Sequence, residues 1–118
     1  MAVQLFDLGK QVEVIPVDAK KIPYAFMIKL YDKTYKFTFR YNNTGGFFTV
    51  DLENSMGKPL VYGEVLRYGR RLFAPIETEE FPLPVIIPLC LNGNISTITT
   101  ENFGSLVKLY LYMREAIS

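Results

Sequence analysis

Three carboxylates are the residues best suited to acid–base chemistry in this 118-residue chain. Asp51 and Glu53 are two positions apart and would share one face of a strand, while Glu64 comes from the next predicted segment. Paired carboxylates can act as acid and base in hydrolysis, where their separation decides the mechanism. However, Asp51 and Glu53 also alternate with Leu52 and lead into a turn, as ordinary solvent-facing residues do. Solvent exposure is the preferred interpretation, and a carboxylate-dependent hydrolase is an alternative.

The other common catalytic groups are missing or isolated. The chain has no histidine, which removes His-containing triads and His-ligated metals. Its single cysteine, Cys90, lies in the apolar run 85–91, so we expect a buried small side chain rather than a reactive thiol or a zinc ligand. The segment 57–59 superficially resembles a phosphate loop, but Pro59 stands where Ser or Thr is required. We therefore predict no enzymatic activity, no cofactor and no metal site.

A basic turn at residues 67–71 has the composition of a nucleic-acid patch, because three arginines surround Tyr68. The net charge of the whole chain is only +1, whereas nucleic-acid-binding domains are usually clearly basic. A solvated turn with a cation–π contact is the preferred interpretation. We expect no sequence-specific nucleic-acid partner, and we keep the turn as a candidate protein contact.

The aromatic residues are more informative, since eight Tyr and nine Phe exceed what one small core readily holds. Tyrosine is enriched in protein interfaces because its ring buries area while its hydroxyl remains paired. Alternation in the last apolar segment places Tyr110 and Tyr112 opposite the presumed core residues. We predict that this face contacts another protein, with ordinary exposed tyrosines as the alternative. The candidate interface residues, including the basic turn, are Tyr110, Tyr112, Lys108, Arg114, Arg67, Tyr68, Arg70 and Arg71.

Strands are the elements that would position these residues. The stretch 35–73 contains three alternating segments separated by turns at 42–46 and 54–59, which predicts a β-meander. Residues 24–30 alternate in the same way and should form a hairpin with the first of the three segments. The apolar face of that hairpin would carry Tyr24, Phe26, Ile28 and Leu30.

The remaining segments are less regular. Residues 11–17 predict a first strand at a sheet edge, because Pro16 cannot donate to a ladder. Residues 74–84 form an acidic, proline-interrupted loop that we expect to be the most mobile part of the chain. Residues 85–91 fit a strand that is covered on both faces or lies in an interface. Residues 106–114 fit a helix or a strand, and β-branched and aromatic content favours the strand.

Strands that recur at roughly ten-residue spacing, with turns between them, are typical of all-β proteins. No linker divides the chain. We therefore predict a single-domain antiparallel β-sandwich or partly closed barrel over residues 1–118, with 1–10 and 115–118 loosely ordered. The chain has neither a signal-peptide pattern at its start nor an apolar run that could cross a bilayer. We expect a soluble protein that is made in a cytoplasm and contacts no membrane.

An ordered series of short motifs is spread over roughly residues 10–113. The motifs are Ile22-Pro23-Tyr24, Phe39-Arg40-Tyr41-Asn42, Phe47-Phe48-Thr49-Val50-Asp51-Leu52, Gly57-Lys58-Pro59-Leu60-Val61-Tyr62-Gly63-Glu64, Leu66-Arg67-Tyr68-Gly69, residues 89–93 and Asn102-Phe103-Gly104. In their order, these motifs resemble the phage baseplate plug family, small proteins encoded among bacteriophage and prophage tail genes.

The resemblance implies a non-enzymatic structural role at the distal end of a phage tail. There the plug would lie with the baseplate hub and the tail tube and close the channel until ejection. It implies a location in the virion tail after synthesis in the bacterial host cytoplasm. We expect the protein to contact hub and tail-tube proteins and copies of itself. The alternative from another class is a small β-barrel that binds a ligand or carbohydrate among its aromatic residues.

Overall fold

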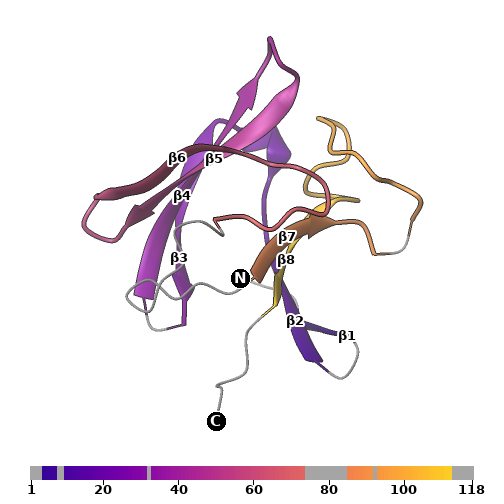
Figure 1. The fold of residues 1–118 in the computed structure, drawn as a ribbon, viewed down its shortest axis with the longest axis horizontal. Coiled ribbons are helices and arrows are strands. Elements are labelled where there is room, and N and C mark those ends of the chain that lie inside the picture. Colours follow the sequence, from indigo (N-terminus) through magenta and orange to yellow (C-terminus); the bar gives the residue numbers. More distant parts are fainter. Residues whose placement is uncertain (1–3, 8–9, 32, 74–84, 92, 113–118) are drawn as a thin grey trace. The chain divides into compact units, whose positions relative to one another are not determined.

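A computed structural model describes residues 4–7, 10–31, 33–73, 85–91 and 93–112 (Figure 1). The described strands form two separate four-stranded antiparallel sheets. The chain divides into two compact units, and each unit contains one of the sheets. The first unit comprises Met1–Asp18, Arg67–Leu72 and Pro84–Ser118, and the second comprises Ala19–Leu66 and Phe73–Leu83.

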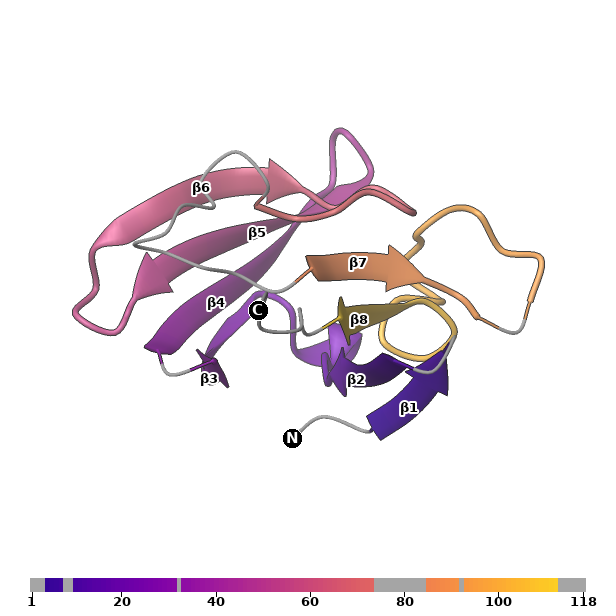
Figure 2. The ribbon, with the colours of Figure 1, turned by 60° about the horizontal axis from the view of Figure 1, so that its bottom comes forward.

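The sheet of the first unit joins strands from distant parts of the sequence. Its order is β1-β2-β8-β7, which Figure 2 shows as four neighbouring arrows. Only the β1–β2 pair is a simple hairpin, because β7 and β8 are joined by the long connection 90–107 and β2 pairs with β8 from the other end of the chain. The strands are β1 (Gln4–Asp7), β2 (Lys10–Ile15), β7 (Val85–Leu89) and β8 (Lys108–Tyr112).

The sheet of the second unit follows the chain in sequence order, β3-β4-β5-β6, and is the predicted β-meander (Figure 2). A short 3-10 turn, η1 (Ala19–Lys21), precedes it. The predicted hairpin between the first two strands is confirmed. The strands are β3 (Tyr24–Leu30), β4 (Lys33–Asn42), β5 (Phe47–Asn54) and β6 (Pro59–Val65).

Aromatic side chains dominate the core of the second unit. Phe37 and Phe39 on β4 are fully buried, as the alternation predicted. The ring of Phe26 on β3 stacks on both of them, with centroids 6.2 and 5.8 Å away. Phe73 meets Phe37 edge-on at 5.6 Å, an arrangement that aromatic pairs favour. This cluster lies on the apolar face of the meander, and Thr38 and Arg40 of β4 belong to the other face.

Buried apolar side chains lie on both faces of the first sheet around β8. On one face, Ile86 of β7 lies opposite Leu111 of β8, and Leu109 of β8 lies opposite Pro88 of β7. Ile86 and Leu109 are fully buried. On the other face, Val14 and Tyr110 form a small buried cluster. The central strand β8 is therefore covered on both sides, and its predicted strand conformation is confirmed.

Two predictions about the first sheet are corrected by the strand pairing. β2 ends at Ile15, before Pro16, and pairs with both β1 and β8, so its predicted edge position is wrong. The proline that does lie in a ladder is Pro88, in the true edge strand β7, where a missing N–H is tolerated. Burial along β7 alternates, so the predicted cover on both faces is wrong, and its alternative, a position in an interface, stays a prediction.

The all-β prediction is confirmed, and two separate antiparallel sheets are compatible with the predicted sandwich. Neither sheet closes into a barrel. The predicted mobile loop at 74–84 lies outside the described residues. The single-domain organisation stays a prediction.

Candidate partner-binding surface

One face of the first sheet carries the predicted tyrosines. Residues that lie opposite each other in an antiparallel sheet share a face. Tyr110 on β8 lies between Val14 on β2 and Ile87 on β7. The flanking β8 positions lie opposite Val85 and Leu89 in the same way. We call this surface the Tyr110 face, and it comprises Val14, Val85, Ile87, Leu89, Lys108, Tyr110 and Tyr112.

Tyr110 itself is only 6% exposed, so it is not the exposed tyrosine that the alternation suggested. Ile87, Leu89 and Tyr112 pack against the cluster that it forms with Val14. Burial raises the pKa of the Tyr110 phenol above its ordinary value of 10.0, and the neighbouring Cys90, Tyr112 and Tyr68 add to the rise. The exposed margin of the face is therefore formed by the half-buried residues around Tyr110, including Tyr112 and Lys108.

The basic turn is bound to the outer edge of β7. The Gly69 N–H donates to the Pro88 carbonyl at 2.9 Å, and the Leu72 N–H donates to the Ile86 carbonyl at 2.8 Å. The Tyr68 hydroxyl accepts the Cys90 N–H at 2.9 Å and donates to the Cys90 carbonyl at 3.4 Å. These bonds fix the turn beside β7, so Tyr68 has a structural role.

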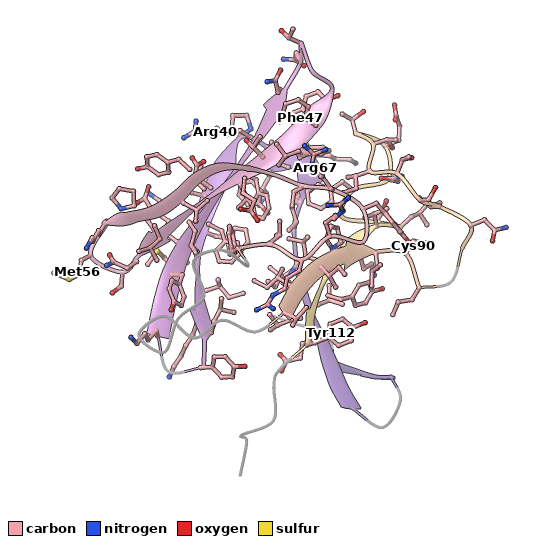
Figure 3. The ribbon with its side chains drawn as sticks, viewed as in Figure 1. Arg40, Phe47, Met56, Arg67, Cys90 and Tyr112 are labelled. Carbon is pink, nitrogen blue, oxygen red and sulfur yellow. The ribbon has the colours of Figure 1, made fainter. Side chains whose placement is uncertain are left out.

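The structure brings one residue of the predicted basic turn, Tyr68, near Tyr110 of the predicted tyrosine face. Tyr68 from the basic turn is close enough to influence the titration of Tyr110. Arg67 and Arg70 are exposed, whereas Arg71 is half-buried. Figure 3 shows Cys90 at the end of β7 and Tyr112 on β8. Arg114 lies outside the described residues.

Most of the tyrosine surplus is absorbed by the two sheets. Tyr35, like Tyr110, is buried, and five further tyrosines are half-buried. Of the eight, only Tyr62 is largely exposed, at 63%. The large number of tyrosines is therefore weaker support for an interface than the sequence suggested.

The three candidate carboxylates do not all lie on one face of the meander: Asp51 and Glu53 share a face, and Glu64 lies on the other. Glu64 lies opposite Val50 and so occupies the apolar face of the meander, where it accepts the Phe73 N–H. Asp51 belongs to the other face of the same sheet. A catalytic pair must flank one bound substrate, whereas Glu64 and Asp51 lie on opposite faces of one sheet, so this pair does not support the hydrolase hypothesis.

Asp51 is a structural residue that the sequence analysis placed in solvent. It is 6% exposed, and its two oxygens accept bonds from Arg40 Nε at 3.1 Å and from the Gly63 N–H at 2.8 Å. Gly63 has a positive φ of 74° and lies where the β5–β6 register shifts. The carboxylate therefore holds a β-bulge, a feature that glycine inside a strand can indicate.

A second residue missed by the sequence analysis is Asn102, which organises the connection from β7 to β8. Its side-chain oxygen accepts the Thr99 N–H at 2.8 Å, and its side-chain nitrogen donates to the Thr97 carbonyl at 3.0 Å. In return, the Thr99 hydroxyl accepts the Asn102 N–H at 3.1 Å. The spacing of Thr and Asn by three residues resembles a helix-capping box and could have signalled this turn.

Within the described part of the chain, no three His, Cys, Asp or Glu residues form a metal-binding group. The same residues include no helix with the length and hydrophobicity needed to span a membrane.

The model of the family described as "Cyanophage baseplate Pam3 plug gp18" matches residues 12–114, a range that includes strands from both sheets. The chain belongs to this baseplate plug family. The family predicted from the ordered motifs is thereby confirmed. No curated protein matches the chain.

As a member of the plug family, the protein has a structural role in a phage baseplate. A baseplate component is part of the virion tail and contacts other baseplate proteins. Tyr112 and Lys108, on the half-buried margin of the Tyr110 face, are among the residues predicted to make protein contacts.

Proposed function

We propose that this chain closes the axial channel of the tail until ejection by packing against the baseplate hub and the tail tube. The observation that carries the proposal is the plug-family match over residues 12–114. The protein would be made in the bacterial host cytoplasm and then built into the tail. It would act through contacts alone, without a cofactor and without turning over a substrate.

The Tyr110 face suits such a contact. Among its seven residues only Lys108 carries a charge. Interfaces are depleted in charge at their centre, enriched in aromatic residues and arginine, and polar at their rim. The half-buried apolar residues around Tyr110 could form the centre, and the exposed Arg67 and Arg70 could contribute to the rim.

Deletion of the gene from the phage tests the closing role. Tails assembled without the chain should have an open channel, and the virions that carry them should lose their DNA. Virions that keep their DNA and show a closed channel would contradict the proposal. Complementation with the intact gene controls for effects on neighbouring tail genes.

Co-expression with the hub and tail-tube proteins tests the surface. We expect Tyr112→Ser to leave the chain folded and to reduce its co-purification with one of these proteins. Tyr62→Ser is the matched control, because it removes the same ring from the other unit, where the residue is 63% exposed. Equal loss with both variants, or with neither, would argue against the Tyr110 face as the contact.

A further inference from the structure

The basic turn holds two exposed arginines close together. The Arg70 N–H donates to the Arg67 carbonyl at 3.0 Å, and Gly69 between them has a φ of 72°. A bond from residue i+3 to residue i, with a positive φ at i+2, indicates a type II turn, whose first and last Cα atoms lie less than about 7 Å apart. Arg67 and Arg70 are these two residues, and both are exposed. The fold thus places two like charges side by side at the surface.

The turn lies beside the end of β7, and a further positive residue lies on the other side of the same strand. The Gly69 N–H donates to the Pro88 carbonyl at 2.9 Å. Across β7, Lys108 of β8 is paired with Leu89. Because neighbouring strands lie about 4.8 Å apart, the backbones of the turn and of Lys108 are separated by roughly 10 Å. This is about the Debye length at 0.1 M salt, so the positive charges act together on an approaching molecule.

The charged residues around β7 are of one sign. Farther across the sheet, Asp7 of β1 lies opposite Lys10 of β2, a pair with no net charge. Like charges held close together repel each other, a small cost in the isolated chain that a carboxylate placed between them would reverse. The basic turn and the Tyr110 face together contain no negative residue and four positive ones, Arg67, Arg70, Arg71 and Lys108.

We propose that the protein that packs on the Tyr110 face carries a cluster of carboxylates, which binds Arg67 and Arg70. Guanidinium groups bind carboxylates through two parallel N–H···O bonds, which fix the direction of a contact as well as strengthen it. The apolar residues around Tyr110 form the centre of this contact, and the charge pairs form its rim. The inference rests on the proposed function, because it names the kind of surface that the hub or the tail tube presents here.

An acidic protein surface fits this region better than the phosphates of DNA. The net charge of the chain is +1, whereas DNA-binding domains are usually clearly basic. Non-specific binding to DNA is supplied almost entirely by charge. Here the arginines instead adjoin the Tyr110 face, on which Lys108 is the only charged residue among seven.

Charge reversal in the phage tests the inference. Arg67→Glu/Arg70→Glu should lower the amount of this chain in purified virions by about tenfold or more, because repulsion at the rim slows association. Lys29→Glu/Lys58→Glu is the matched control, since it makes the same change in net charge at two exposed lysines of the other unit. It should leave the amount in virions unchanged. Quantitative mass spectrometry of the virions measures both.

Neutral substitutions separate binding from folding. Arg67→Gln/Arg70→Gln removes the repulsion between the arginines and should preserve or slightly raise the thermal midpoint of the purified chain. The amount of this variant in virions should still fall, though less than after charge reversal. A lower midpoint together with lost incorporation would mean that the arginines hold the turn, and it would overturn their assignment to a partner.

Second-site revertants of the charge-reversed phage identify the partner surface. We expect changes in the hub or tail-tube gene that replace an acidic residue with a neutral or basic one. Compensating changes confined to acidic residues of this chain, such as Glu77, Glu79 or Glu80, would overturn the proposal. Normal incorporation of the charge-reversed chain would also overturn it.

A short labelled DNA duplex provides the last arm of the test. The purified wild-type chain should not bind it, and binding that Arg67→Gln/Arg70→Gln abolishes would overturn the proposal in favour of a phosphate contact. Failure of the plug function gives a different result. Tails that stay closed after deletion of the gene, although the chain is normally incorporated through its arginines, would contradict the closing role and leave this inference standing.

Discussion

The two sheets of this protein show two ways of building the same kind of structure. The meander pairs each strand with the next one along the chain, so its pairing depends on local turns. The first sheet pairs Val14 with Tyr110, residues from opposite ends of the sequence. Local pairing is visible in a sequence, whereas distant pairing depends on the closure of a long loop. The difference explains which predictions succeeded.

The largest expected effects come from one core residue in each sheet. Phe37→Ala removes a fully buried ring that contacts Phe26, Phe39 and Phe73, and it should lower the free energy of unfolding by about 3–5 kcal/mol. Leu109→Ala in the first sheet should cost about 2–5 kcal/mol. Urea unfolding of each variant, followed by two independent spectroscopic probes, measures both free energies of unfolding.

The same pair of variants tests the predicted single domain. We expect one cooperative transition, and either substitution should shift all of it. Two transitions, each moved by only one of the variants, would show that the units unfold separately.

A smaller effect is expected at the bulge of the meander. Asp51→Ala deprives the Gly63 N–H of its acceptor and releases Arg40, which should cost about 1–3 kcal/mol. Glu53→Ala is the control, because among the described residues its half-buried carboxylate accepts one long bond, from the exposed Tyr62, and we expect a change within about 0.5 kcal/mol. Equal costs at the two positions would mean that Asp51 does not hold the bulge.

The connections of the two sheets offer a third comparison. Asn102→Ala removes two side-chain bonds from the β7–β8 connection and should destabilise the protein by about 1–3 kcal/mol. Asn42→Ala removes one bond, to the Gly45 N–H in the exposed β4–β5 turn, and should cost about 0.5–1 kcal/mol. Thermal unfolding gives both values, and a larger loss at Asn42 would reverse the expected order.

The smallest effect concerns pH and the Tyr110 face. Because the pKa of Tyr110 is raised in the folded chain, the folded state holds this proton more tightly than the unfolded state. The resulting stability is complete below about pH 10 and is lost as the pH rises through the folded pKa. Tyr110→Phe should therefore lose less stability than the wild type between pH 8 and 11. Parallel losses would contradict the burial of this phenol.

Alternation and turn residues were sufficient to predict the meander. They gave the hairpin of β3 and β4 and the buried residues Phe37 and Phe39. β-Branched and aromatic content favoured a strand over a helix within 106–114, where the structure has a strand at Lys108–Tyr112. They could not show that β2 pairs with β8, because nothing local links the two ends of the chain. The edge position predicted from Pro16 is wrong because β2 pairs with strands on both sides. Pro16 does not interfere with this pairing, since the strand ends at Ile15.

The candidate surface was predicted in part. Alternation correctly separated Tyr110 from Leu109 and Leu111, but it could not reveal that Tyr110 is buried as well. Val14 and Ile87 flank Tyr110 on its own face, and Val14 does so through the pairing of β2 with the distant β8. Asp51 was placed in solvent because the bulge at Gly63 depends on geometry that alternation does not describe.

Imaging of intact and DNA-ejected tails tests the central claim most directly. A reconstruction of the baseplate before ejection should place density for both four-stranded sheets across the channel, in contact with the hub and the tail tube. In tails that have ejected their DNA, the channel should be open. Density for this chain at the outer rim of the baseplate, with the channel closed by another protein, would contradict the account.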